Sequence, residues 1–428
     1  MTTLPQHAVL LSFEGPDPYA MVGGLGVRVT ELAAALAEAG VQTTLLFVGD
    51  PKRPALERPA ANLEYRRWCQ WLSVHHPGNV YDGEHQKIAD YRQSAPKFVC
   101  DEIVAPAVAR GERVLVLAEE WHTAPATIEL ARRLRERGLR EATTVVWNAN
   151  NTYGFEMIDW PALRSAATIT TVSRYMKFEL AHFDIGSLVI PNGIPARLLA
   201  GPDSNLVAAL ERACAHRPMF VKIGRFSPDK RWLPAIDAFV QLRESFPQAT
   251  LIARGGREPY ADEVFARARR YGLEVGEVSA PAGDRAALID ALAASTAPII
   301  HIKSFIDDAL LYALYATADA VLANSGKEPF GLVGLEVMAA GGLAVCGSTG
   351  EEYAEPFVNA IVCDTSDGRE LATYLTETLS DSASTRAMRE NGRATARRYL
   401  WPTIVRILAR KLAYIDGAGT AAGAHALL

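Results

Sequence analysis

The chain has 428 residues, of which 49% are hydrophobic and 22% are charged, and this near-average composition argues against a largely disordered protein. The formal net charge of −5 disfavours a dedicated nucleic-acid binder. No apolar run reaches the roughly 18 residues of a membrane span, and the first residues do not resemble a secretion signal. Five scattered cysteines without a CxxC pair fit a reducing compartment, so we expect a cytoplasmic protein.

Apolar runs typical of strands alternate with helical patterns through the first half of the chain. A helix is predicted over Val27–Ala39, between strands over Ala8–Phe13 and Val41–Val48. Further strands are predicted over Val114–Leu117, Thr143–Trp147, Thr168–Val172 and Leu188–Ile190. An arginine-rich helix over Glu129–Arg140 is interpreted as a solvated face with Leu130 and Leu134 turned inward. A peripheral membrane contact is the disfavoured alternative, because the helix lacks bulky aromatic residues.

A second cycle of the same kind follows the turn signal Pro191-Asn192-Gly193. Strands are predicted over Phe220–Ile223, Thr250–Ala253, Ile299–Ile302 and Ala320–Ala323, and helices over Leu233–Glu244 and Leu310–Ala316. The alternation predicts an α/β protein with two doubly wound, Rossmann-like domains.

The strongest chemical signal is the segment Glu328-Pro-Phe-Gly-Leu-Val-Gly-Leu-Glu336. Its Pro-Phe-Gly turn opens a helix predicted over Leu332–Ala340, which places Glu336 about one turn inside the helix. The first N–H groups of a helix favour an anion such as a diphosphate. Two glutamates fit beside that anion if they accept hydrogen bonds from sugar hydroxyls while cations elsewhere neutralise the phosphates.

Candidate cations lie in Gly224-Arg225-Phe-Ser-Pro-Asp-Lys230, directly after a predicted strand. Ligands of doubly wound domains bind beyond the carboxyl ends of the strands, and arginine and lysine are suited to phosphate. The alternative is a surface turn with solvated Arg225 and Lys230. A further loop, Val22-Gly-Gly-Leu-Gly-Val27, would let backbone approach a ligand at a helix N-terminus, but it does not match a dinucleotide fingerprint.

These segments together resemble the retaining GT-B glycosyltransferases of the glycogen and starch synthase-like, group 1 (GT4-type) family. The resemblance covers nearly the whole chain and is most specific at Glu328–Glu336. It implies two facing domains with an interdomain cleft: an acceptor-side domain over 1–195 and a nucleotide-sugar-binding domain over 196–400. A helix over 401–416 would pack back toward the first domain, followed by a flexible tail over 417–428.

The resemblance also implies roles for individual residues. Arg225 and Lys230 would clamp the diphosphate of the donor, and Glu336 would bind the ribose hydroxyls. Glu328 would hold the sugar together with the backbone of Phe330, Gly331 and Leu332. Donor contacts from the first domain would come from Gly23, Gly24 and Leu25. The donor is expected to be UDP- or ADP-glucose, with no other cofactor and no metal.

The chain departs from the family pattern at two positions. Met21 stands where glycogen synthases carry a phosphate-binding lysine, and Asn148 stands where the family usually has a histidine. Both changes argue against glycogen synthesis. Asn148 could donate a hydrogen bond to the donor sugar but could not serve as a general base, and the alternative is that it ties down the loop 149–154.

The resemblance places the acceptor on the first domain, where Trp121 and His122 belong to its motifs. Trp71, His75 and Tyr81 lie in an aromatic segment that is predicted to add to the acceptor site, since aromatic faces suit sugar rings; ordinary loop packing is the alternative. A metal site at His75-His76 is disfavoured because no third ligand has suitable spacing. The predicted function is transfer of a hexose, favoured to be glucose, to a hydroxyl acceptor of a sugar or small glycoside, with retention of configuration. A nucleotide-sugar epimerase and a catalytically silent sugar-binding protein are the alternatives.

Overall fold

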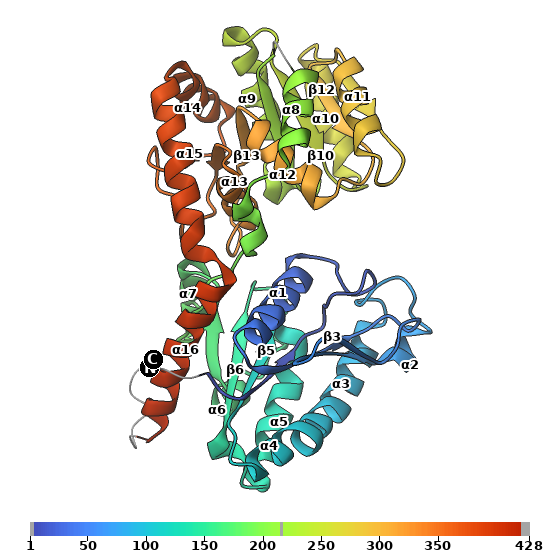
Figure 1. Ribbon diagram of the computed structural model, residues 1–428, viewed down its shortest axis with the longest axis vertical. Coiled ribbons are helices and arrows are strands. Elements are labelled where there is room, and N and C mark those ends of the chain that lie inside the picture. The colour runs from blue at the N-terminus through green and yellow to red at the C-terminus, as the bar shows by residue number, and fades with distance from the viewer. Residues whose placement is uncertain (1–3, 215–216, 421–428) are drawn as a thin grey trace. The chain divides into compact units, whose positions relative to one another are not determined.

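The computed structural model describes residues 4–214 and 217–420, which form two compact units (Figure 1). The first unit contains the chain up to Gly193 together with the segment from Trp401 onward, and the second contains Ile194–Leu400. The structure continues as a helix through the start of the predicted tail, while residues 421–428 of that tail lie outside the described residues.

An eight-stranded sheet in the order β3-β4-β2-β1-β5-β6-β7-β8 forms the centre of the first unit. Its neighbouring strands are parallel except for the antiparallel pair β3–β4 at one edge. The strands are β1 (His7–Leu11), β2 (Gln42–Val48), β3 (Leu56–Ala60), β4 (Leu63–Trp68), β5 (Val114–Glu119), β6 (Thr143–Ala149), β7 (Thr168–Thr171) and β8 (Leu188–Val189). All strand predictions for this half are confirmed. The pair β3–β4 was not predicted, because its sequence is polar and charged at many positions.

Helices cover this sheet, and one of them comes from the end of the chain. They are α1 (Gly24–Glu38), α2 (Gln70–Ser73), α3 (Glu84–Phe98), α4 (Ala105–Ala109), α5 (Ala124–Glu136), α6 (Trp160–Ala166), α7 (Arg174–Ala181) and α16 (Trp401–Thr420). Helix α16 packs against α1, and Asp416 accepts a 2.8 Å hydrogen bond from the Thr144 hydroxyl on β6. A Cβ on Gly193 would lie 2.4 Å from the Trp401 ring, so glycine permits this close packing.

The arginine-rich helix differs from its predicted range. Helix α5 begins at Ala124 because Pro125 is tolerated in the first turn, and it ends before Gly138, whose φ is +68°. Leu130 and Leu134 are buried as predicted, while Arg132 and Arg133 pair with Glu129 on the surface.

A second, seven-stranded parallel sheet has the order β11-β12-β10-β9-β13-β14-β15. Its strands are β9 (Met219–Ile223), β10 (Thr250–Arg254), β11 (Val275–Val278), β12 (Ile299–Ile302), β13 (Ala320–Ala323), β14 (Ala344–Cys346) and β15 (Ile361–Val362). The helices of this unit are α8 (Ser204–Ala213), α9 (Trp232–Ser245), α10 (Tyr260–Arg270), α11 (Arg285–Ala294), α12 (Asp308–Thr317), α13 (Leu332–Ala340), α14 (Gly368–Ser380) and α15 (Ser382–Ala396). The four strands predicted here are confirmed, and α13 has its predicted bounds.

Both sheets reverse their strand order at one point, between β1 and β5 in the first unit and between β9 and β13 in the second. The loops at such a switch point diverge and leave a crevice beyond the carboxyl ends of the strands. The two topologies therefore predict ligand-binding sites at the loops after β1, β5, β9 and β13.

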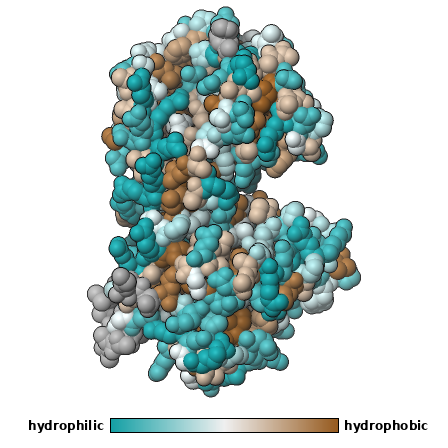
Figure 2. All heavy atoms as spheres, in the orientation of Figure 1, coloured by the Kyte–Doolittle hydropathy of each residue, from teal (hydrophilic) through white to brown (hydrophobic). Residues whose placement is uncertain are grey.

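No helix within the described ranges is both long and apolar enough to cross a bilayer. On the face seen in Figure 2, hydrophobic side chains form patches separated by hydrophilic ones.

Candidate active site

The loops after β9 and β13 bring two predicted residues together. Lys230 ends the short 3₁₀ turn Pro228–Lys230, and its Nζ forms an ion pair with Oε1 of Glu328. Both side chains are about four-fifths buried, at 21% and 18% exposure. The Gly326 N–H donates to the Asp229 carbonyl over 2.6 Å, which joins the two loops through the backbone as well. The predicted cation and the first predicted glutamate thus share one site at the switch point.

Arg225 lies in the same loop, three residues before the 3₁₀ turn, and its environment differs from that of Lys230. Its side chain is exposed, and its carbonyl accepts a 2.8 Å hydrogen bond from the buried Trp232 indole. That bond fixes the backbone of the loop, while the Arg225 side chain is open to solvent.

A tightly packed loop supports the N-terminus of α13. Gly331 has φ +76°, and a Cβ there would lie 2.2 Å from the Thr349 hydroxyl, so only glycine fits. The Tyr353 hydroxyl donates to the Gly331 carbonyl, and the Phe330 ring packs 5.7 Å from the Tyr353 ring. The helix that follows, beginning with Leu332, is apolar nearly all round and lies largely buried. The N–H groups at its start are therefore held in fixed positions.

Glu336 occupies a different environment from Glu328. Burial, with a smaller contribution from Asp308, raises the pKa of Glu336 to about 7, while Arg197 opposes the rise. Its carboxylate is therefore only partly ionised near neutral pH, and a pair of hydroxyl donors would stabilise the ionised form.

Sequence reasoning missed a buried cation beneath this site. Lys222, on β9, is 2% exposed and donates to the Leu322 carbonyl over 3.1 Å and to Oδ1 of Asn324 over 2.5 Å. A lysine inside an otherwise apolar strand, two residues before the Gly224 turn, was the available signal.

In the first unit the predicted glycine loop folds around a carboxylate. Oε2 of the buried Glu14, three residues after β1, accepts the N–H groups of Val22 (3.2 Å), Gly23 (2.9 Å) and Gly26 (3.0 Å). Glu14 takes neither the Gly24 nor the Leu25 N–H group. An anion at the start of α1 would therefore meet a carboxylate already in place, and any donor contact would fall to Gly24 and Leu25.

Asn148 is fully buried, and its polar atoms are used internally. Its Nδ2 donates to Glu119 (2.9 Å), its Oδ1 accepts from the Thr170 hydroxyl (2.8 Å), and its carbonyl accepts the Glu120 N–H (3.0 Å). This geometry favours the alternative in which Asn148 positions its neighbours. A direct contact with the donor sugar stays a prediction.

Asn148 belongs to a buried polar network at the carboxyl ends of β5 and β6. Glu119 also pairs with Arg28 of α1 at 3.2 Å, and Arg28 donates to Asn192 of the Pro-Asn-Gly turn. Glu120 has a φ of +68°, unusual for a residue other than glycine, and its Oε1 accepts the Asn150 N–H at 2.6 Å. Burial is the main reason that the pKa of Glu120 rises to about 8.

Three of the five predicted acceptor residues lie in one aromatic cluster. The His122 ring packs against Trp121 at 4.2 Å and Tyr81 at 5.3 Å, and its Nε2 is 2.7 Å from Glu84 Oε1. The Tyr81 hydroxyl donates to Glu14 over 2.6 Å, which links the cluster to the glycine loop. The exposed Tyr153 reaches its edge, 6.2 Å from Trp121.

The other two predicted acceptor residues lie elsewhere. Trp71, on α2, is 64% exposed and His75 is exposed, and neither makes a ring contact with the cluster. Within the described parts of the chain, no group of three or more His, Cys, Asp or Glu side chains is arranged to hold a metal ion.

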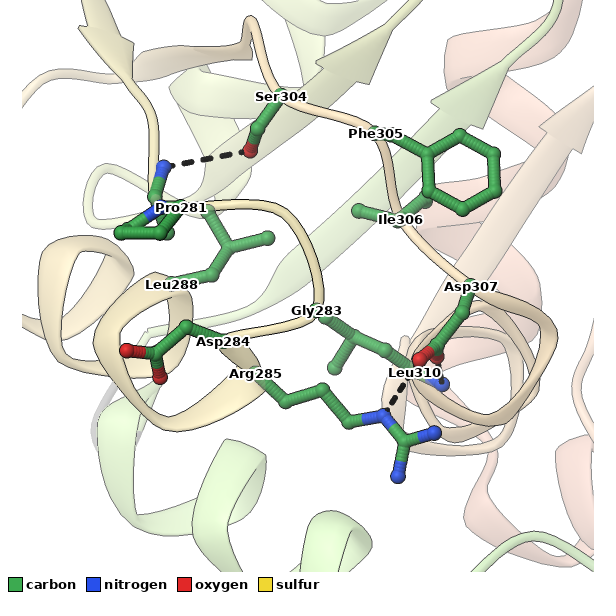
Figure 3. Close-up of a pocket in the computed structure, with 11 residues that line it drawn as sticks. Pro281, Gly283, Asp284, Arg285, Leu288, Ser304, Phe305, Ile306, Asp307 and Leu310 are labelled. Atoms are coloured by element: carbon green, nitrogen blue, oxygen red, sulfur yellow. Dashed lines mark hydrogen bonds and ion pairs between the residues drawn. The ribbon is translucent and has the colours of Figure 1, made fainter.

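A separate small cavity lies beyond the carboxyl ends of β11 and β12 (Figure 3). Its volume is about 60 Å³, and Arg285 and Asp307 pair across its rim at 2.7 Å. None of the predicted donor residues lines it, and it is far smaller than the roughly 300 Å³ of a typical ligand pocket.

Two doubly wound units with polar sites at their switch points define a protein of the GT-B class. Residues 22–198 match the model of Glycosyltransferase Family 4, and residues 213–395 match that of Glycosyl transferases group 1. Together the two models match most of the chain, which therefore belongs to the group 1, GT4-type glycosyltransferases. No curated protein sequence matches the chain.

Solved structures show the same fold at low sequence identity. Sucrose-phosphate synthase from Thermosynechococcus elongatus is 19% identical with a TM-score of 0.71, over 96% of this chain and 100% of that one. The catalytic domain of starch synthase IV from Arabidopsis thaliana, bound to ADP and acarbose, is 14% identical with a TM-score of 0.70, over 97% of this chain and 99% of that one. HepE from Anabaena, in complex with UDP-glucose, is 20% identical with a TM-score of 0.61, over 95% and 99%.

Proposed function

We propose that this glycosyltransferase moves a hexose, favoured to be glucose, from UDP- or ADP-glucose to a hydroxyl of a sugar or small glycoside, with retention of configuration. The observation that carries the proposal is the Lys230–Glu328 pair at the β9/β13 switch point, beside the start of α13. The nucleotides and sugars bound in the starch synthase and HepE structures support this donor class.

The residues of the second unit suit the departure of a nucleoside diphosphate. Lys230 and Arg225 would offset the charge that develops on the leaving phosphate, and the N–H groups at the start of α13 would add to this effect. Glu328 holds the Lys230 ammonium in place and would accept a hydrogen bond from the transferred sugar. Glu336 would accept the ribose hydroxyls.

The protein's part in this mechanism is positioning and charge stabilisation. The acceptor hydroxyl would give its proton to an oxygen of the leaving diphosphate as the new glycosidic bond forms on the same face of the sugar. Trp121, His122 and Tyr81 of the first unit would supply the acceptor surface.

Release of free nucleotide from UDP-, ADP- and GDP-hexoses, with and without sugar acceptors, tests the proposal. We expect release to require one donor and to increase with a hydroxyl acceptor. Lys230→Ala should abolish most of it, and the exposed Lys97→Ala serves as the matched control. Conversion of the donor sugar without nucleotide release would indicate an epimerase. Donor binding without turnover would indicate a silent sugar-binding protein.

A further inference from the structure

Lys222 is a buried lysine at the centre of the second sheet. It lies on β9, between β10 and β13, and its Nζ is 5.1 Å from the centroid of the Trp232 ring. Its two acceptors, the Leu322 carbonyl and the Asn324 side chain, both belong to β13 or to the residue directly after it. Lys222 therefore ties the two strands together where the sheet order reverses.

The same contacts connect Lys222 to the donor site. Nδ2 of Asn324 donates to the Arg231 carbonyl at 3.4 Å, next to Lys230. Arg231 has a φ of +50° and donates to the Ser348 hydroxyl at 2.9 Å. A chain of side-chain and backbone contacts thus leads from Lys222 to the turn that carries Lys230 and to the loop that carries Glu328.

The charge of Lys222 depends on the same neighbours. Burial, followed by repulsion from Lys230 and Arg231, lowers the pKa of Lys222 to about 7, and Glu328 opposes the shift. Lys222 contacts the indole of Trp232 on α9 and the side chain of Asn324 after β13. The charged groups that act on it are Lys230 and Arg231 from the loop after β9 and Glu328 from the loop after β13. Two cations and one anion leave a net positive surrounding.

A bound diphosphate would reverse that balance. Its negative charge beside Lys230 and Arg231 favours a third cation behind them, and the interaction is weakly screened because Lys222 is shielded from solvent. We propose that Lys222 is a positioning residue of the donor site, which takes up a proton when a nucleoside diphosphate binds and so couples donor affinity to pH. This inference rests on the proposed function, because it requires a diphosphate at Lys230.

Calorimetric titration with UDP and ADP at pH 8, in buffers of different ionisation enthalpy, measures the coupling. At this pH Lys222 is mostly neutral, and Glu336 is already mostly ionised and contributes little. We expect net proton uptake by the wild-type protein, and nucleotide affinity that falls by up to about tenfold per pH unit above 7. Lys222→Arg should still bind nucleotide but without this uptake or pH dependence, because arginine does not titrate in this range.

Lys222→Met should bind more weakly and without uptake. Lys87→Met is the matched control, because Lys87 is equally buried but lies in the first unit, and the uptake should persist in it. Thermal melting of each variant reports on folding, and if Lys222→Met does not fold, the wild type and Lys222→Arg decide the question. Two results would overturn the role of Lys222 and leave the proposed function standing. One is nucleotide binding with equal proton uptake in the wild type and Lys222→Arg, and the other is nucleotide binding by the wild type without proton uptake. Failure of the wild type to bind any nucleotide would overturn both.

Discussion

The two glutamates predicted for the donor site, Glu328 and Glu336, have different surroundings in the second unit. Glu328 is paired with Lys230, whereas Glu336 is near Asp308 and has a raised pKa. Glu328→Gln should mainly lower kcat, because the sugar beside it changes charge during transfer. Glu336→Gln should mainly raise KM, because ribose contacts are alike in ground and transition states. Steady-state kinetics with varied donor checks this, and a change confined to KM in both variants would contradict it.

Asn148 is held by hydrogen bonds to its neighbours, which favours its positioning role. Its amide satisfies Glu119 and Thr170 inside the first unit, so Asn148→Ala should lower the free energy of unfolding by about 1–3 kcal/mol. Urea denaturation measures the loss, with the exposed Asn205→Ala as control. If Asn148→Ala kept wild-type stability but lost activity, Asn148 would contact the ligand after all.

Glu120 should give the first unit a defined pH dependence. Its folded pKa, about 8, lies above the ordinary value of 4.5, so the folded state binds more protons than the unfolded state between these values. The stabilisation is complete below about pH 4.5 and is lost as the pH rises toward 8. Glu120→Gln, which mimics the neutral form, should reduce this decline. Denaturation midpoints of the wild type and Glu120→Gln, measured from pH 5 to 8, test this prediction. If the midpoints of both proteins changed equally with pH, Glu120 would not be the cause of the pH dependence.

At the scale of elements, α13 is bounded by two glycines with positive φ that differ in their surroundings. Gly331 faces the Thr349 hydroxyl, whereas a Cβ on Gly341 would meet nothing within 4 Å. Gly341→Ala should cost only the roughly 1–2 kcal/mol of a left-handed backbone. Gly331→Ala should also displace the loop at Thr349 and reduce turnover by tenfold or more. Melting curves and kcat values of Gly331→Ala and Gly341→Ala distinguish backbone strain from displacement of the Thr349 loop. Equal turnover in both variants would show that the position of this loop does not affect catalysis.

The connections between elements also explain two motifs seen in the sequence. The Pro-Asn-Gly turn supplies Asn192 to Arg28 and makes room at Gly193 for Trp401. The glycine loop before α1 supplies N–H groups to Glu14. In both cases the turn residues hold the framework on which the candidate site is built.

At the scale of the whole molecule, the charges that would offset the donor diphosphate come from the chain itself. Arg225, Lys230 and the start of α13 lie at one edge of the second sheet, so we expect activity to be independent of a divalent metal. Nucleotide release should be unchanged in EDTA. Loss of release in EDTA, with recovery on addition of magnesium or manganese, would contradict this expectation.

The sequence by itself determined most of the parallel strands, the two-unit organisation of the fold and the choice of Lys230 and Glu328 as candidate site residues, whereas β3, β4, β11, β14 and β15 were not predicted. Buried parallel strands are continuous apolar runs, and their carboxyl ends meet at one sheet edge, so local patterns suffice. Only the tertiary structure decided what fills the space around these ends. Glu14, Glu120 and Lys222 were not recognised, and neither were the hydrogen bonds that Asn148 forms with Glu119 and Thr170 inside the first unit. The burial and partners of such side chains come from segments far apart in the chain, and no local pattern records them.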